Sequence, residues 1–357
     1  MHKLILSLSY ILLVACGDSS LVISDCQSDG NIVPVCGFQN PEDFALLPDG
    51  ETMLVSQMGY IDADDPAKLS PGSIAEYHPE KPIRIVFEGG VRAEKQAGWG
   101  DPECPGAPSA DFAPHGIDLD TRADGRTQLL SVNHGGRESI EFFEVTTDQG
   151  QTHLTWRGCV VMSGELFLND VVATNNGGFW ATHMFPKHSI WAIIRSALGS
   201  KLGYAVAWSA EQGIKKLPGS DGAMPNGIEK SADEHFAYIN MYFGSTLKKL
   251  DVRSGETVKA IELASPDNSA WDRDGKHLLV ASHVASIRDA YVCQGLSQGS
   301  CGFAFEIVRV NSETMARETL VAHEGAPMGG VTVALPVKES LYLGTFAGDR
   351  IARIAYP

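Results

Sequence analysis

A short phrase that recurs six times is the feature that most constrains what this chain can fold into. Each copy begins with a polar residue and an apolar, strand-like stretch, continues through a turn that is typically Asp-Gly or Asn-Gly, and ends in a second β-rich stretch. In the first copy, for example, the turn at Asp49-Gly50 separates residues 41–44 from residues 52–55. The six copies begin near residues 42, 115, 169, 226, 268 and 330.

This repetition predicts an all-β, six-bladed β-propeller. Repeats of about 40 to 60 residues that each form a small antiparallel sheet are typical of propellers. Third strands are expected at residues 73–77, 140–145, 247–250 and 350–354. One blade cannot bury both of its faces, so the ring must close and residues 38–357 form one domain. A two-sheet sandwich is the alternative, but strands grouped in repeating units favour the propeller.

One segment, residues 188–203, departs from the β pattern. Its apolar residues fall at helical spacing, which predicts a short inserted helix. We expect the apolar face to cap the edge of the propeller, with the wall of a substrate gorge as the alternative. The residues of this face are Ile190, Ile193, Ile194, Ala197 and Leu198.

The first fifteen residues are expected to be a cleaved leader. Lys3 precedes an apolar run, residues 4–14, that is too short to cross a bilayer. The run ends in Leu13-Val14-Ala15-Cys16, which resembles a bacterial lipoprotein signal. The resemblance implies acylation of Cys16, a lipidated N-terminus and linker over residues 16–37, and a lipid-anchored protein of the cell envelope. Gly17 is compatible with the outer membrane if the host has two membranes; an ordinary secretory leader is the alternative.

Export would place the remaining six cysteines in an oxidising compartment, where all of them can pair. No Cys-x-x-Cys motif occurs, so neither a redox motif nor a thiolate zinc site is indicated. Proximity in the sequence favours Cys26 with Cys36 and Cys293 with Cys301, which leaves Cys104 for Cys159, although other pairings stay open.

The charge balance narrows the class of partner. The chain has 28 basic and 44 acidic side chains, a net charge of −16. Such a polyanion repels nucleic acid and anionic lipid. We therefore expect a small-molecule ligand, no nucleic acid, and membrane contact only through the N-terminal lipid.

Oxygen-bearing side chains stand at the beginnings of the first strands. In a propeller these innermost strands line the central channel, so residues from separate repeats would converge there. Their carboxylate and amide oxygens suit a hard cation such as calcium. Asp43 and Asp170 each follow one of these residues and would point to the opposite side, where they could hold a second ion. Asn and Asp are also common in turns and strand caps, but recurrence at one position in four repeats favours convergence. The residues are Glu42, Asn169, Asn226, Asp267 and Asn268.

Seven phrases, in order from about residue 38 to the end, resemble the paraoxonase/arylesterase family. They are Pro41-Glu42-Asp43, Phe112-Ala113-Pro114-His115-Gly116-Ile117, Val132-Asn133-His134, Asn169-Asp170-Val171-Val172-Ala173, Asn226-Gly227-Ile228, Asp267-Asn268 and Gly330-Val331-Thr332-Val333-Ala334.

The resemblance implies a six-bladed propeller with two calcium ions, acting on lactones and, more promiscuously, on aryl esters and phosphotriesters. It assigns the catalytic calcium to Glu42, Asn169, Asn226, Asp267 and Asn268. It assigns the structural calcium to Asp43, Asp170 and the backbone carbonyl of Ile117. His115 and His134 match the proposed histidine dyad, His283 a histidine of the active-site wall, and Thr332 a further pocket position.

The implied chemistry is physically coherent. A calcium ion can polarise an ester carbonyl and stabilise an oxyanion, and a neutral histidine can take a proton from water. Our hypothesis is that His115 is the base and that His134 orients it, while Glu42 or Asp267 stays open as base or nucleophile. The chain has neither the G-x-S-x-G nor the H-E-x-x-H motif.

Two departures from the family pattern stand out. The last cysteine, Cys301, precedes the sixth repeat, so the ring must close by strand pairing without a disulfide to the last blade. Residues 181–184 lack the acidic residue usual after this strand, so the substrate pocket can differ there. The leading function is a calcium-dependent lactone or ester hydrolase. The alternatives are a gluconolactonase-type sugar-lactone hydrolase and a non-catalytic, calcium-stabilised binding propeller.

Overall fold

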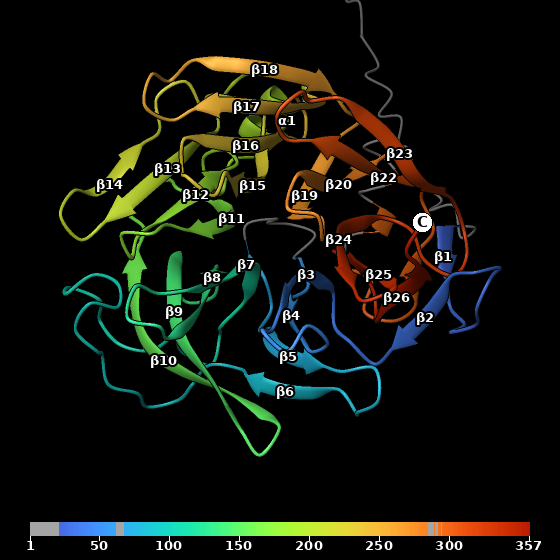
Figure 1. The fold of residues 1–357 in the computed structure, drawn as a ribbon, viewed down its shortest axis with the longest axis horizontal. Helices are drawn as coiled ribbons and strands as arrows, with labels where there is room; N and C mark the ends of the chain where they lie inside the picture. The colour runs from blue at the N-terminus through green and yellow to red at the C-terminus, as the bar shows by residue number, and fades with distance from the viewer. Residues whose placement is uncertain (1–20, 62–67, 285–288, 290–291, 294) are drawn as a thin grey trace, which may run out of the picture.

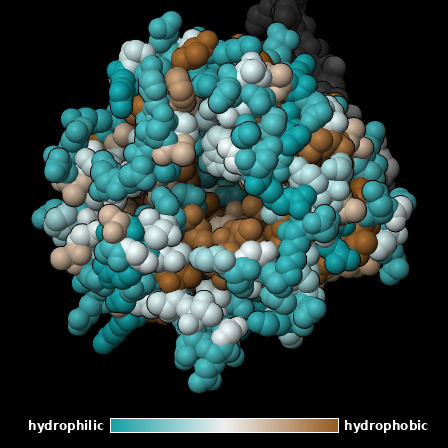
Figure 2. All heavy atoms as spheres, viewed as in Figure 1, coloured by the Kyte–Doolittle hydropathy of each residue, from teal (hydrophilic) through white to brown (hydrophobic). Residues whose placement is uncertain are grey.

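A computed structural model describes residues 21–61, 68–284, 289, 292–293 and 295–357, and it confirms the predicted propeller. Six four-stranded antiparallel sheets stand around one axis (Figure 1). The face seen in Figure 2 is hollowed at the centre of the ring and has a mainly hydrophilic rim. Within the described residues, no helix is both long and apolar enough to cross a membrane.

Five blades are continuous in sequence, and the sixth takes its outermost strand from the N-terminal segment. In each blade the strands are ordered from the innermost outward. The first blade is β3 (Pro41–Leu46), β4 (Met53–Gln57), β5 (Ser73–Tyr77) and β6 (Arg84–Phe87); the second is β7 (Pro114–Thr121), β8 (Thr127–Asn133), β9 (Ser139–Asp148) and β10 (Gln151–Val161); the third is β11 (Leu168–Ala173), β12 (Phe179–His183), β13 (Tyr204–Ser209) and β14 (Gly213–Lys216). The fourth is β15 (Pro225–Lys230), β16 (Phe236–Met241), β17 (Thr246–Asp251) and β18 (Thr257–Glu262); the fifth is β19 (Pro266–Trp271), β20 (His277–His283), β22 (Phe305–Asn311) and β23 (Arg317–His323); the sixth is β24 (Val331–Val337), β25 (Ser340–Thr345), β26 (Arg350–Ala355) and β2 (Val33–Cys36).

The hydrophobic core lies between the blades, where each sheet packs face to face against the next. Between the second and third blades, for example, Phe142 packs on Phe179 and Trp208. Comparable clusters fill the other five gaps, including the one between the last blade and the first, where Tyr342 meets Tyr77. Burial of one such side chain contributes about 1.5–3 kcal/mol. Opening the ring at any gap would expose a whole cluster.

The ring closes by strand pairing, as predicted. Strand β2, from the segment predicted as a linker, pairs with β26 from Val33 opposite Arg353 to Cys36 opposite Arg350. A second contact pairs β1 (Val22–Ile23) with β21 (Ser300–Cys301). The fully buried guanidinium of Arg350 donates hydrogen bonds to the carbonyl oxygens of Asp25 and Pro327. Hydrogen bonds thus hold the N-terminal segment to the last blade.

The three predicted disulfides are confirmed. They join Cys26 to Cys36, Cys104 to Cys159, and Cys293 to Cys301. The second of these connects the loop after β6 to the edge strand β10. Cys16, the predicted lipidation site, and the leader lie outside the described residues.

The inserted helix exists, but the prediction of its buried face is wrong. Helix α1 (Ile190–Ala197) begins after Ser189, whose hydroxyl accepts a hydrogen bond from the backbone N–H of Ala192. Its fully buried residues are Ala192 and Ser196, whereas Ile190 and Leu198 are 58% and 81% exposed. Small side chains let the helix backbone approach the propeller closely, and this leaves most of the large apolar side chains outside.

Candidate active site in the central channel

An irregularity at the same place in all six innermost strands positions the candidate residues. Pairing with the second strand of the blade is interrupted just after the first residue of each inner strand. Such β-bulges re-aim side chains and are common next to active sites. The interruption contains Glu42, His115, Asn169, Asp170, Asn226, Asp267, Asn268 and Thr332.

Two glycines allow the inner strands to approach closely at these bulges. A Cβ atom on Gly116 would lie 2.4 Å from the Oδ1 atom of Asp170, and one on Gly227 would lie 2.6 Å from the backbone oxygen of Asp267. No real Cβ makes contacts this short. The His-Gly and Asn-Gly pairs are therefore parts of inner strands here, and they are not turns.

The five residues assigned to the first cation form what we call the amide–carboxylate cluster: Glu42, Asn169, Asn226, Asp267 and Asn268. The structure brings them together from four blades. The side-chain amide of Asn268 donates to Glu42 at 2.7 Å, and the side chain of Asn226 hydrogen-bonds to Asp267. All five are buried.

Within the described part of the chain, four buried oxygens of this cluster have no hydrogen-bond partner. They are Oε2 of Glu42 and the Oδ1 atoms of Asn169, Asn226 and Asn268. A buried oxygen without a partner costs free energy, so a group of four at one place needs a ligand that satisfies them together. The amide nitrogens of Asn226 and Asn268 are turned toward carboxylates, which leaves the oxygens free. This donor set fits a hard divalent cation such as calcium.

Burial also makes the carboxylates of this cluster difficult to ionise in the metal-free protein. Burial raises the pKa of Glu42 well above its usual value, and Asp43 and Asp267 raise it further. Burial raises the pKa of Asp267 to about 8. A divalent cation would stabilise both carboxylates in their charged form.

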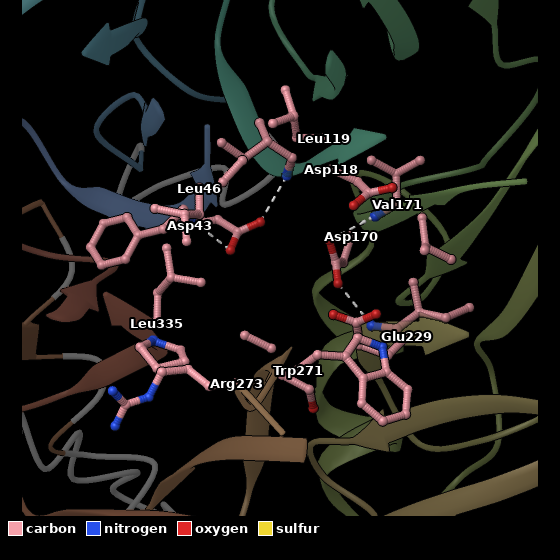
Figure 3. A pocket seen from close by; sticks show the side chains of 18 residues that line it. Asp43, Leu46, Asp118, Leu119, Asp170, Val171, Glu229, Trp271, Arg273 and Leu335 are labelled. Atoms are coloured by element: carbon pink, nitrogen blue, oxygen red, sulfur yellow. Dashed lines mark hydrogen bonds between the residues drawn. The ribbon is translucent and has the colours of Figure 1, made fainter. Parts of the chain in front are cut away.

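A second group of acids lines a cavity of about 260 Å³ on the other side of the bulges. We call it the carboxylate cluster: Asp43, Asp118, Asp170 and Glu229. All four carboxylates face this cavity (Figure 3). Asp43 and Asp170 are predicted ligands, whereas Asp118 and Glu229 are not among the residues predicted from the sequence. Each stands three residues after a bulge residue, His115 or Asn226, so aligning the repeats could have found them.

Backbone N–H groups hold the two central acids of the carboxylate cluster. Asp43 accepts from Phe44 and Ile117, and Asp170 accepts from Val171 and Ile228. Burial raises the pKa of Asp43 to about 7, and burial together with Asp43 raises that of Asp170. A carboxylate oxygen keeps a further lone pair after accepting one hydrogen bond, so both side chains can still bind a cation.

The two candidate catalytic histidines are in direct contact. Nδ1 of His115 lies 2.9 Å from Nε2 of His134. The other nitrogen of His115, Nε2, faces the amide–carboxylate cluster, 3.4 Å from the amide nitrogen of Asn169 and 3.7 Å from Oε1 of Glu42. Burial, and secondarily His134, lower the pKa of His115 well below its usual value, which keeps the imidazole neutral.

The two candidate pocket residues have structural partners. His283 accepts from the Tyr242 hydroxyl at 2.9 Å and donates to the Val331 carbonyl at 3.0 Å, and burial lowers its pKa to about 4. It lies 3.5 Å from Asp267, which places it against the amide–carboxylate cluster. Thr332 is 1% exposed and donates its hydroxyl hydrogen to the backbone oxygen of Glu42, so it ties β24 to β3.

Among the described residues, one further group of potential metal ligands, Asp272, Asp274 and His277, lies between β19 and the start of β20. The Arg309 guanidinium already donates to Asp272 and Asp274, both at 2.8 Å, and the Tyr356 hydroxyl donates to Asp272. These acids have a cationic partner in the protein itself and form an ion-pair cluster.

Comparisons with known proteins agree with the fold and identify a family. The model of a family described as "Arylesterase" matches residues 66–351. A gluconolactonase from Xanthomonas campestris is 14% identical, with 95% of this chain and 92% of that chain covered and a TM-score of 0.51. A luciferin-regenerating enzyme is also 14% identical, with 90% and 95% covered and a TM-score of 0.51. At these identities the two structures show the fold alone. No curated protein matches the sequence.

Proposed function

Because the chain belongs to the arylesterase family, and is in general terms an esterase- or lactonase-type propeller hydrolase, we propose that it is a calcium-dependent hydrolase of lactones and aryl esters. The observation that carries the calcium dependence is the set of four buried oxygens without partners, which come from Glu42, Asn169, Asn226 and Asn268.

The residues of the amide–carboxylate cluster would hold the catalytic ion. A calcium ion bound there supplies polarisation of the ester carbonyl and stabilisation of the oxyanion that forms on it. The amide groups of Asn226 and Asn268 orient Asp267 and Glu42 by hydrogen bonds and keep their own oxygens directed to the ion. In the second site Asp43 and Asp170, with the Ile117 carbonyl, would hold a structural ion.

His115 acts as the general base. Its Nε2 atom faces the cluster and its low pKa keeps it unprotonated, so it can accept a proton from the attacking water. His134 contacts the other ring nitrogen and orients the imidazole.

Hydrolysis assays of the purified protein test this function. The substrates are an aliphatic lactone, an acyl-homoserine lactone, a sugar lactone and phenyl acetate, each with calcium and with a chelator. We expect calcium-dependent turnover of the aliphatic lactone or phenyl acetate, and a large loss of turnover in His115→Gln with calcium binding intact. Turnover of the sugar lactone alone would point to the gluconolactonase type. A folded, calcium-loaded protein that hydrolyses nothing would contradict the proposal.

We also propose that the protein is anchored in the bacterial cell envelope through a lipid on Cys16, on the evidence of the sequence Leu13-Val14-Ala15-Cys16. Labelled palmitate should be incorporated into the wild-type protein and not into Cys16→Ser. Equal labelling of both would contradict the anchor.

A further inference from the structure

A buried glutamate, Glu138, contacts His134 and so extends the hydrogen-bonded chain that begins at His115. It stands just before β9, four residues after His134, in a part of the chain that none of the family phrases includes. Nδ1 of His134 lies 3.0 and 3.1 Å from its two carboxylate oxygens. The side chain of His134 is 0% exposed and that of Glu138 is 7% exposed, so no bulk water competes for this contact.

The contact determines which nitrogens carry protons. A carboxylate can only accept, so Nδ1 of His134 must carry its proton and donate it to Glu138. In the neutral ring, Nε2 of His134 is then an acceptor, and Nδ1 of His115 must donate to it across 2.9 Å. The proton of His115 is thereby fixed on Nδ1. The lone pair of His115 is left on Nε2, the atom that faces the amide–carboxylate cluster.

Two further contacts hold Glu138 in its ionised form and in place. The backbone N–H of Leu168 donates to Oε1 at 2.7 Å, and the ammonium group of Lys187 donates to Oε2 at 2.7 Å. Burial acts to raise the pKa of Glu138, but His134 and Lys187 outweigh it and the net pKa is lowered. Leu168 immediately precedes the candidate ligand Asn169, so the same contact ties the histidines to the inner strand β11.

We propose that Glu138 is a positioning residue that fixes the tautomer of His134 and, through it, presents the unprotonated Nε2 of His115 to the reacting water. This inference rests on the proposed function, in which His115 is the base. When His115 takes a proton from water at Nε2 it becomes an imidazolium, and Glu138 stabilises that charge through the hydrogen bonds of His134. Tautomer control by a buried carboxylate is an established way to orient a catalytic histidine.

The alternative is that Glu138 serves only to pair with Lys187 and stabilise the fold. Glu141 offers a matched control for this alternative. It is a fully buried carboxylate in the same blade, and it also pairs with a cation, Arg137, at 2.8 Å. It accepts from Ser139 and Trp156 and, in the described ranges, makes no hydrogen bond to a histidine. Replacing Glu141 therefore tests the loss of a buried ion pair alone.

The experiment compares Glu138→Gln and Glu141→Gln with the wild-type protein in two measurements. Long-range ¹H–¹⁵N spectra of protein with labelled histidines report the tautomers, and steady-state assays with calcium report kcat and KM. We expect wild-type His134 to be protonated on Nδ1. In Glu138→Gln this preference should weaken, kcat should fall about 10- to 100-fold, and KM should change little. Glu141→Gln should lower the melting temperature and leave tautomer and kcat unchanged.

Lys187→Met gives a second variant that keeps the carboxylate. It should retain the His134 tautomer and lose less kcat than Glu138→Gln does. If Glu138→Gln fails to fold, the wild-type spectrum decides, because His134 protonated on Nε2 would overturn the proposal.

Equal losses of kcat in Glu138→Gln and Glu141→Gln, or unchanged kcat in Glu138→Gln, would also overturn the inference. If the wild-type protein hydrolyses no substrate, the proposed function fails, and the tautomer measurement still shows whether Glu138 positions His134.

Discussion

The side-chain oxygens on the two sides of the inner-strand bulges differ in their hydrogen bonding. In the amide–carboxylate cluster, four buried oxygens have no hydrogen-bond partner among the residues that the structure describes. In the carboxylate cluster, both oxygens of Asp43 and Asp170 accept backbone N–H groups. Protein dipoles already stabilise the second group, whereas the first depends on a ligand. The amide–carboxylate cluster is therefore suited to bind a cation that activates a substrate, and the carboxylate cluster is suited to hold the inner strands together.

The difference arises between residues that are adjacent in sequence. Glu42 lies in one bulge and Asp43 follows it directly, while Asn169 and Asp170 both lie in another. The second residue of each pair reaches across to an N–H group of the next inner strand: Asp43 to Ile117 and Asp170 to Ile228. At each of these two irregularities, one residue therefore offers an oxygen to a cation, and the next residue joins its strand to the neighbouring blade by a hydrogen bond.

The largest effect is expected at the amide–carboxylate cluster. Replacing Glu42 by Gln removes a charge that the bound cation needs, so kcat should fall by about 10²- to 10³-fold. The matched control is Glu76→Gln, which breaks the ion pair with Arg84 in the same blade without touching the channel. Steady-state kinetics at saturating calcium checks this. Comparable losses of kcat in the two variants would contradict the proposal that the oxygens without hydrogen-bond partners bind the catalytic cation.

Replacing Gly227 by Ala should damage both clusters at once. The added Cβ would lie 2.6 Å from the backbone oxygen of Asp267, and Ile228, next in the chain, donates to Asp170. Since the obstacle is backbone, we expect a loss of about 3 kcal/mol in unfolding free energy, together with weaker calcium binding. Ile228→Val is a conservative control that should cost about 0.5–1.5 kcal/mol. Chemical denaturation and calcium titration measure both effects, and wild-type stability in Gly227→Ala would show that the inner strands can separate freely.

Replacing Asp170 by Asn should affect stability in calcium more than in chelator. With calcium the variant loses a charged ligand and one backbone acceptor, at a cost of about 1–3 kcal/mol. Without calcium the raised pKa of Asp170 already favours the neutral acid, which Asn resembles. Melting temperatures in calcium and in EDTA give the comparison. An equal calcium-induced rise in melting temperature in both proteins would rule out an ion at this cluster.

The metal-free protein should lose stability as the pH rises from about 6.5 to 8. The pKa values of Asp43 and Asp267 are raised to about 7 and about 8, so the folded state keeps protons that the unfolded state has released. That stability is lost as the pH rises through the folded pKa, by up to about 1.4 kcal/mol per pH unit for each group. His115 and His283, whose pKa values are lowered, are neutral in the folded state over this range, while unfolded histidines, with a pKa of about 6.5, release their remaining protons by about pH 7.5 and oppose the loss only in its lower part.

Melting curves in EDTA between these pH values test the prediction. Calcium should remove most of the slope, since it keeps the carboxylates charged. Asp43→Asn should remove the part of the slope that ends near pH 7 and leave the part due to Asp267, which continues to about pH 8. A slope that is the same with calcium and with EDTA would contradict the assignment of these acids to cation sites.

Much of the fold could be predicted because it depends on local patterns. The six inner strands begin within two residues of the predicted positions; two disulfides match sequence proximity, and the third joins the two cysteines that remain. The buried face of helix α1 could not be predicted from such local patterns. Spacing identified its apolar face, yet Ile190 and Leu198 are exposed and Ala192 and Ser196 are buried. Which face is covered depends on how closely the helix can approach the propeller, and the apolar pattern alone does not contain that information.

In the candidate site, too, some residues could be predicted from the sequence and others depend on tertiary contacts. Residue types at the strand starts were sufficient to predict the amide–carboxylate cluster, and the resemblance to the paraoxonase/arylesterase family identified the two histidines. Glu138 was missed because it stands in a turn with no repeated pattern, and its role depends on contacts with Leu168 and Lys187, which are 30 and 49 residues away.

By itself, the sequence determined that this chain forms six blades and that oxygen ligands stand where the blades begin, because strand pattern and turn residues act over a few positions. The tertiary structure decided which oxygens are left without a partner and which histidine nitrogen carries a proton. Those properties depend on neighbours from other blades: Asn268 and Glu42, which share a 2.7 Å hydrogen bond, are 226 residues apart. Only closure of the ring brings such pairs together, and the bulges then determine where each side chain points.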